Sequence, residues 1–139
     1  MQGMARSEDL YILRDFLKFS LGDQVPPADT AAMIGLVASN SYVSAKEAWE
    51  FVRLQVNQIL AKLGGLGAVN TRLGPLVIRV VSGLGNWQVV KQLDQMGKDY
   101  GVYFGATELA TAKELVQTNM AWMQMFGSTA CDYFLQNAN

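Results

Sequence analysis

A long amphipathic pattern dominates the middle of the sequence, from Val43 to Leu63. Apolar residues recur there at i, i+3, i+4 and i+7, which is the spacing of one face of a helix. The residues of this stripe are Ala45, Ala48, Trp49, Val52, Val56, Ile59, Leu60 and Leu63. Phe51 and Leu54 fall on the other side, so the predicted helix has apolar residues on two sides. Such a helix suits the interior of a stacked helical array better than the outside of a simple bundle.

Capping residues set the expected limits of this helix. Ser44 can accept hydrogen bonds from the first turn, and Glu47 three residues later completes a Ser-x-x-Glu capping box. Gly64 and Gly65 end the helix, and Lys62 lies in its last turn, where a cation is favourable. The pattern therefore predicts one uninterrupted helix that begins near residue 43.

Further apolar stripes and turn signals divide the remaining chain into helices. The expected helices cover residues 8–21, 27–40, 66–84, 87–100, 108–126 and about 129–135. Ser7, Asn86 and Thr107 are placed to act as N-caps. Pro27 fits the first turn of its helix, because the N–H that it lacks would have no partner there.

Pro75 interrupts the apolar stripe of residues 66–84. A proline in a regular helix interior costs roughly 3 kcal/mol, because it removes a hydrogen bond and clashes with the preceding turn. We therefore expect either a kink at Pro75 or a helix that restarts with Pro75 in its first turn.

These patterns together predict an all-α fold of about seven helices, each of roughly 10–20 residues. The short turns between them make neighbouring helices antiparallel. The architecture resembles a right-handed superhelix of the HEAT or armadillo type, although no residue-level repeat is visible. Residues 7–139 should form a single helical domain, since 139 residues support one core. Residues 1–6 are expected to be a flexible N-terminus or residues added to the natural protein.

The chain contains no histidine and one cysteine, Cys131. The lack of histidine excludes Ser–His and Cys–His nucleophile pairs and every histidine-containing zinc site, including HExxH. A single cysteine can form neither an internal disulfide nor an all-cysteine metal site. We therefore expect no catalytic residue, no metal ligand and no cofactor in this chain. A site built from carboxylates alone is the remaining alternative for enzyme chemistry.

The charges are unevenly distributed, although the net charge is only −1 and argues against nucleic acid as a partner. No acidic residue occurs between Glu50 and Asp94. The cations in that span are Arg53, Lys62, Arg72, Arg79 and Lys91. The span is either an ordinary solvated surface or a basic surface that faces an anionic group.

The sequence gives no sign of a membrane span. No apolar run approaches the ~18–20 residues that a transmembrane helix needs. No basic-then-apolar secretory leader is visible either.

The segment Ala48-Trp49-Glu50-Phe51-Val52-Arg53 is the first of four that resemble a known family. It resembles the Trp-x-Phe-aliphatic signature in the C-terminal helical domain of M1-family zinc aminopeptidases. Residues 26–40 resemble its Asp-containing helix that ends in Asn, and residues 92–96 resemble its Leu-acid-x-aromatic helix. Glu114 with Asn119-Met120-Ala121-Trp122 resembles its Glu…Asn-Ile-x-Trp helix. The resemblance covers almost the whole chain and rests on the joint order of these motifs.

The chain departs from the family pattern in several places. Gln55-Val56 stands where the family usually has Asn-Trp. Residues 84–87, Leu-Gly-Asn-Trp, replace a segment that often reads Phe-Ser-Thr-Glu. These differences indicate a divergent member.

The resemblance implies a non-catalytic domain that encloses the peptide-binding cavity of an aminopeptidase and influences which peptide lengths gain access. The parent enzyme would remove N-terminal amino acids from peptides, and its zinc, HExxH and Gly-x-Met-Glu-Asn motifs would lie in an upstream catalytic domain. The implied partners are that catalytic domain of the same polypeptide and the peptide substrate. The isolated chain could also self-associate through apolar surface left uncovered. Family members occur as membrane-anchored ectodomains, in the endoplasmic reticulum lumen and in the cytoplasm, so the compartment stays open.

On this reading the acid-free span would contact the C-terminal carboxylate of the peptide, with Arg72 and Arg79 as the first candidates and Arg53 as the next. The expected packing anchors are Trp49, Phe51 and Trp122.

The alternative is a stand-alone helical-repeat adaptor that binds a protein or peptide partner in a groove. The two readings share a fold and differ in whether an HExxH-containing domain is encoded upstream.

Overall fold

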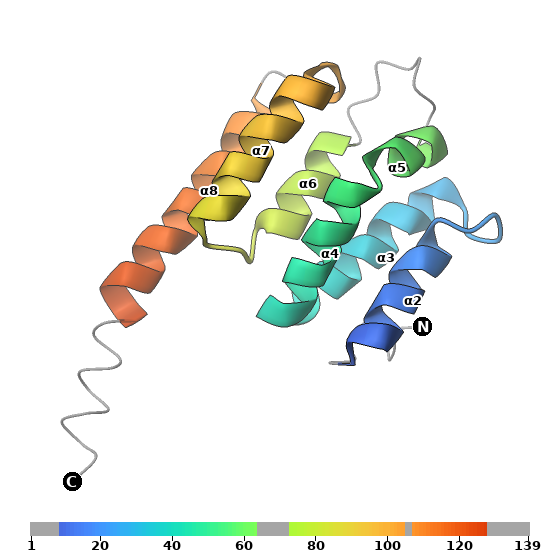
Figure 1. Ribbon diagram of the computed structural model, residues 1–139, viewed down its shortest axis with the longest axis horizontal. Helices are drawn as coiled ribbons and strands as arrows, with labels where there is room; N and C mark the ends of the chain where they lie inside the picture. Colours follow the sequence, from blue (N-terminus) through green and yellow to red (C-terminus); the bar gives the residue numbers. More distant parts are fainter. Residues whose placement is uncertain (1–8, 64–72, 105–106, 128–139) are drawn as a thin grey trace, which may run out of the picture.

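The computed structural model describes residues 9–63, 73–104 and 107–127. Helices make up the described regular structure, and no strand occurs within these ranges (Figure 1). The α-helices are α2 (Leu10–Ser20), α3 (Pro27–Asn40), α4 (Tyr42–Leu54), α5 (Val56–Leu63), α6 (Leu73–Val81), α7 (Trp87–Tyr100) and α8 (Glu108–Trp122). A short 3-10 helix (Gly101–Tyr103) and a π-helical turn (Met123–Gly127) complete the described elements. The predicted all-α fold is confirmed.

The helices are arranged in two layers. Figure 1 shows α2, α4 and α7 nearer the viewer, with α3, α6 and α8 behind them. Within the rear layer α6 contacts both α3 and α8, and within the front layer α2 contacts α4. Contacts of α3 with α2 and α4, and of α7 with α8, join the layers. The predicted right-handed superhelical twist stays a prediction.

The core lies between the two layers and is apolar. Its largest fully buried side chains are Phe16, Leu13, Leu17, Ile34, Ile59, Leu73, Leu84, Leu93, Val37, Val52, Val77 and Val80. A buried polar contact closes the first hairpin, because the Thr30 hydroxyl donates to the backbone carbonyl of Ser20 at 2.7 Å. This bond satisfies a carbonyl at the C-terminus of α2 that has no partner within the helix.

The N-cap predicted at Ser7 is wrong. Helix α2 begins at Leu10, and the side chain of Asp9 accepts a hydrogen bond from the backbone N–H of Tyr11. Asp9 has the extended backbone conformation of an N-cap, and its carboxylate also suits the positive end of the helix dipole. Ser7 itself lies outside the described residues.

The single helix predicted for residues 43–63 is also wrong, because the structure divides it at Gln55 into α4 and α5. Gln55 leaves the helical region (φ −114°, ψ 25°), while its N–H still bonds the carbonyl of Phe51 at 2.9 Å. The break lets α5 take its own direction and contact α3. At the end of α5 the Lys62 ammonium donates to the backbone carbonyl of Gly22, in the loop after α2.

The capping box of α4 is made by a different pair of residues from the predicted Ser44 and Glu47. Helix α4 begins at Tyr42, and the Ser41 hydroxyl accepts from the Ser44 N–H at 3.1 Å. The Ser44 hydroxyl in return accepts from the Ser41 N–H at 2.9 Å. Glu47 instead accepts from Arg14 Nε of α2 at 3.0 Å. The chain turns sharply enough at Ser41 to start the helix there, which leaves Glu47 facing α2.

The other predicted starts agree with the structure where it describes them, whereas two predicted ends are too late: α6 ends at Val81 and not at residue 84, and α8 ends at Trp122, after which a π-helical turn follows. Pro27 is the first residue of α3, and Asn86 caps α7 by accepting from the Val89 N–H at 3.0 Å. Helix α8 begins directly after Thr107, although the Thr107 side chain makes no capping hydrogen bond. Pro75 lies in the first turn of α6 as far as the structure describes it, and the residues before Leu73, which separate a restart from a kink, lie outside the described ranges. The predicted helical residues 66–72 and 129–135 lie outside the described ranges.

A transmembrane helix is not found among the described residues, since none of their helices combines the length and the hydropathy that crossing a bilayer requires.

Replacing Ser41 by alanine should lower the free energy of unfolding by about 1 kcal/mol, because the first turn of α4 loses its side-chain acceptor. Glu47→Gln is the matched comparison and should have the smaller effect, since Glu47 bonds only the exposed Arg14. Urea unfolding followed by circular dichroism measures both. A larger loss for Glu47→Gln would contradict this assignment of the cap.

Candidate functional site

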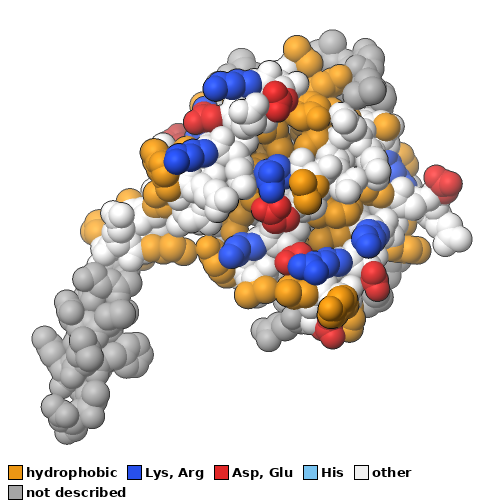
Figure 2. All heavy atoms as spheres, viewed as in Figure 1, with side chains coloured by type: hydrophobic (Ala, Val, Ile, Leu, Met, Phe, Trp, Pro, Cys, Tyr) orange, Lys and Arg blue, Asp and Glu red, His pale blue; other side chains and the backbone are white. Residues whose placement is uncertain are grey.

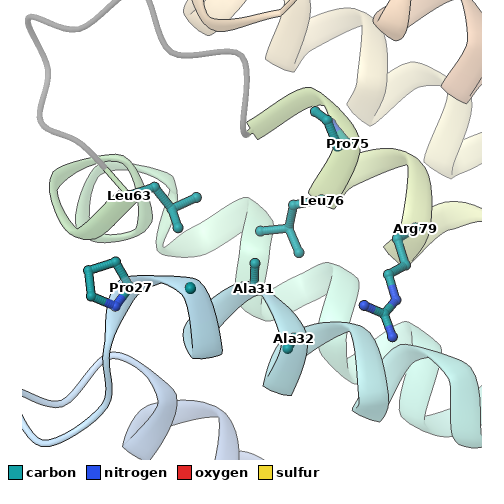
Figure 3. Close-up of a pocket in the computed structure, with 8 residues that line it drawn as sticks. Pro27, Ala31, Ala32, Leu63, Pro75, Leu76 and Arg79 are labelled. Carbon is teal, nitrogen blue, oxygen red and sulfur yellow. The ribbon is translucent and has the colours of Figure 1, made fainter.

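A cleft of about 420 Å³ lies on the rear layer between α3 and α6 (Figure 3). Its lining residues are Pro27, Ala28, Ala31, Ala32, Leu63, Pro75, Leu76 and Arg79. The lining residues of α3 include three alanines, whose short side chains leave space beside the helix. Pro27 and Pro75 lie in the first turns of α3 and α6, where a missing N–H is tolerated. The walls are apolar apart from Arg79. We call this feature the α3–α6 cleft.

Arg79 extends from α6 toward α3 at one end of the α3–α6 cleft, as Figure 3 shows. Its guanidinium lies over Gly35 of α3, where a Cβ atom would stand 2.5 Å from Arg79 Cζ and 2.7 Å from Nη1. The absence of a side chain at Gly35 therefore makes room for the guanidinium. Within the described part of the chain, this guanidinium makes no hydrogen bond or ion pair. The arrangement can bind a carboxylate at the end of an apolar cleft.

A second cleft, of about 320 Å³, continues along α3 on the other side of Ala32, which lines both. Its other lining residues are Phe16, Phe19, Gln24, Val25, Pro26, Asp29, Met33 and Leu36. Helix α3 thus buries Ile34 and Val37 in the core and presents small apolar residues on its outer side. The outer side of α3 is therefore an apolar surface of low relief.

The three predicted arginines are not brought together. Arg79 lies at the α3–α6 cleft, Arg72 lies outside the described residues, and Arg53 lines a separate pocket. That pocket, of about 240 Å³, is lined by Arg53, Val56, Gln92, Gln95, Met96, Asp99 and Tyr100. It lies where the α4–α5 break faces α7, and we call it the α5–α7 pocket.

The Arg53 side chain is about one-third exposed (34%) and pairs with Glu50, Nη2 to Oε2, at 2.5 Å. Its Nε is buried without a hydrogen-bond partner.

Residues 51–93 contain no acidic residue, but acidic side chains from outside this span lie close to one of its cations in the folded structure. Glu50 neutralises Arg53 from one turn before, and Asp99 lies in the same pocket as Arg53. Figure 2 likewise shows Lys and Arg side chains interspersed with Asp and Glu on the front layer. A continuous basic surface is therefore not seen on this face.

The three predicted anchors differ in burial. Trp49 is 2% exposed, and its indole N–H donates to Gln92 Oε1 at 2.6 Å, which links α4 to α7. Phe51 is partly buried against the core. Trp122 is 58% exposed, so it does not anchor the described core. It ends α8, whose last turns extend beyond the neighbouring helices in Figure 1.

Asn119, which the sequence analysis named only as part of a motif, has a structural role that was not predicted. Its amide donates to the backbone carbonyls of Ser82 at 2.8 Å and Leu84 at 2.9 Å. These bonds hold the α6–α7 turn against α8. No local signal in the sequence marks this role, because the two carbonyls that Asn119 holds lie more than thirty residues before it.

A scan of the sequence against models of known protein families finds no match. Among the residues that the structure describes, no group of three or more His, Cys, Asp or Glu side chains could hold a metal ion.

The contact between Gly35 and Arg79 predicts a non-additive effect of two substitutions. Gly35→Ala in the Arg79→Ala background should raise the free energy of unfolding by about 0.5–1 kcal/mol, because alanine favours the helix over glycine. In the wild-type background the new methyl group must displace the guanidinium, so the gain should be smaller. A double-mutant cycle from urea unfolding measures the coupling. Equal effects in both backgrounds would show that Arg79 does not lie on Gly35 in solution.

The two motif tryptophans should differ in their contribution to stability. Trp49→Ala should lower the free energy of unfolding by about 3–5 kcal/mol, because it opens a cavity in the core and leaves Gln92 unpaired. Trp122→Ala, at an exposed position, should cost much less. Thermal or urea unfolding of both variants measures the difference, and comparable losses would contradict the assigned burial.

Proposed function

We propose that this chain is a non-catalytic helical domain of the type found at the C-terminus of M1-family zinc aminopeptidases. In this role the domain helps to enclose the peptide-binding cavity, and its α3–α6 cleft contacts the C-terminal part of the peptide. The observation that carries the proposal is Arg79, a cation without a partner among the described residues, at the end of an apolar cleft. Zinc and the catalytic groups belong to the upstream domain of the same polypeptide.

The contacts of the motif residues support the resemblance. Trp49, from the Trp-x-Phe segment, bonds Gln92, which begins the segment 92–96. Asn119, from the Asn-Met-Ala-Trp segment, holds the turn between α6 and α7. Trp49 therefore joins two of the four segments, while Asn119 joins its segment to backbone carbonyls outside them.

The chemistry of the α3–α6 cleft suits a peptide terminus. A guanidinium offers planar pairs of N–H donors that match a carboxylate, and such charge-assisted bonds are stronger than neutral ones. Leu63, Pro75 and Leu76 provide apolar walls for the last side chains of the peptide. The pairing favours peptides long enough to reach Arg79, which relates the cleft to the selection of peptide length.

A stand-alone adaptor is the second candidate. It is favoured by the apolar outer side of α3, where two clefts meet at Ala32. Such an adaptor would bind a partner peptide along α3 without any catalytic domain. The reading frame upstream of residue 1 separates the two candidates, because only the aminopeptidase requires an encoded HExxH motif there.

A peptide with a free C-terminal carboxylate should bind this chain at least about tenfold more tightly than the same peptide amidated at its C-terminus. Fluorescence anisotropy with an N-terminally labelled, leucine-ending peptide measures both affinities. Arg79→Gln should abolish the difference, because the donor for the carboxylate is lost. Lys91→Gln, on the exposed surface of α7, is the control and should retain it. Equal binding of both peptides to the wild-type chain would refute the role of Arg79.

A further inference from the structure

The α5–α7 pocket lies apart from the α3–α6 cleft and combines charges of both signs with an apolar floor. Arg53 comes from the last turn of α4 and Asp99 from the last turn of α7. Val56 and Met96, which are 2% and 4% exposed, form the floor. At about 240 Å³ the pocket suits a small molecule better than a drug-sized ligand.

One end of the pocket is suited to an anion. Glu50 occupies Nη2 of the Arg53 guanidinium and Nε is buried, so the nitrogen left for a ligand is Nη1, which makes no hydrogen bond or ion pair within the described residues. A charge-assisted hydrogen bond from Nη1 to an anion would be favourable. Helix α5 begins at Val56, and the first turn of a helix carries N–H groups without partners and a partial positive charge. Arg53 and this helix start therefore attract the same group, such as a carboxylate.

The other end is suited to a cation. Both carboxylate oxygens of Asp99 accept only from the neutral amide of Gln95, at 3.2 and 3.1 Å. No Lys or Arg among the described residues pairs with Asp99. Helix α7 ends at Tyr100, and the C-terminal end of a helix carries a partial negative charge. Asp99 and this helix end therefore attract an ammonium group.

Tyr100 also lines this pocket. Its hydroxyl donates to Asn57 Oδ1, at the start of α5, at 3.3 Å. This bond joins the C-terminal end of α7, which favours a cation, to the N-terminal end of α5, which favours an anion. The pocket is thus lined by one cation, Arg53, and one anion, Asp99.

We propose that the α5–α7 pocket binds a free α-amino acid with an apolar side chain. The carboxylate of the ligand pairs with Arg53, its ammonium pairs with Asp99, and its side chain rests on Val56 and Met96. The inference is independent of the proposed function, because it uses neither Arg79 nor the α3–α6 cleft.

The test is a titration of the isotope-labelled chain with L-leucine, followed by two-dimensional NMR. Saturable shifts are expected at the amides of Val56, Met96 and Tyr100. Removing either charge of the ligand should weaken binding by at least about tenfold, which corresponds to about 1.4 kcal/mol. The matched ligands are 4-methylpentanoate, which lacks the ammonium, and isopentylamine, which lacks the carboxylate. This comparison uses the unaltered protein, so it does not depend on the folding of any variant.

Variants then assign the two ends of the site. Arg53→Gln and Asp99→Asn should each weaken L-leucine binding by at least about tenfold. Lys98→Gln, on the same helix but outside the pocket lining, should bind L-leucine as the wild type does. The proposal is overturned if L-leucine gives no saturable shift at ~10 mM. It is equally overturned if a ligand with only one charge binds as well as L-leucine, or if folded Arg53→Gln and Asp99→Asn variants bind it unchanged.

Discussion

Close approach at glycine positions is the constraint on which the packing of the rear layer depends. Helix α6 contacts α3 on one side and α8 on the other. On the α3 side, Arg79 of α6 lies over Gly35, and on the α8 side, Glu108 lies over Gly74 of α6. A Cβ atom at Gly74 would stand 2.6 Å from Glu108 Oε2. Glycine costs helix stability, but at these two positions it lets a charged side chain lie flat on the next helix. The contact over Gly35 also places Arg79 at the end of the α3–α6 cleft.

Local signals predicted most of the helix limits, while the exceptions depend on distant contacts. Asn86 and Pro27 act through their own turn of helix, so the sequence around them is sufficient. Gln55 is different, because it is neither glycine nor proline and the buried residues Val52 and Val56 keep helical spacing across it. The break is accompanied by the contact of α5 with α3, which no local pattern contains.

The candidate sites were predictable only in part. The sequence identified Arg79 as a cation in an acid-free span, but its position over Gly35 joins residues of two helices. Arg53 pairs with Glu50 on one helix face, a pair that the sequence analysis did not predict although its i, i+3 spacing is local. The meeting of Arg53 with Asp99 depends on how α4, α5 and α7 pack, so it required the structure.

Helix α5 is only eight residues long, yet it forms part of both candidate sites. Val56 at its start lines the α5–α7 pocket, and Leu63 at its end lines the α3–α6 cleft. Its far end is tied to the loop after α2 by Lys62, and its near end is tied to α7 by Asn57. The two candidate sites therefore share one short helix, and a substitution within α5 has to be judged for its effect on both of them.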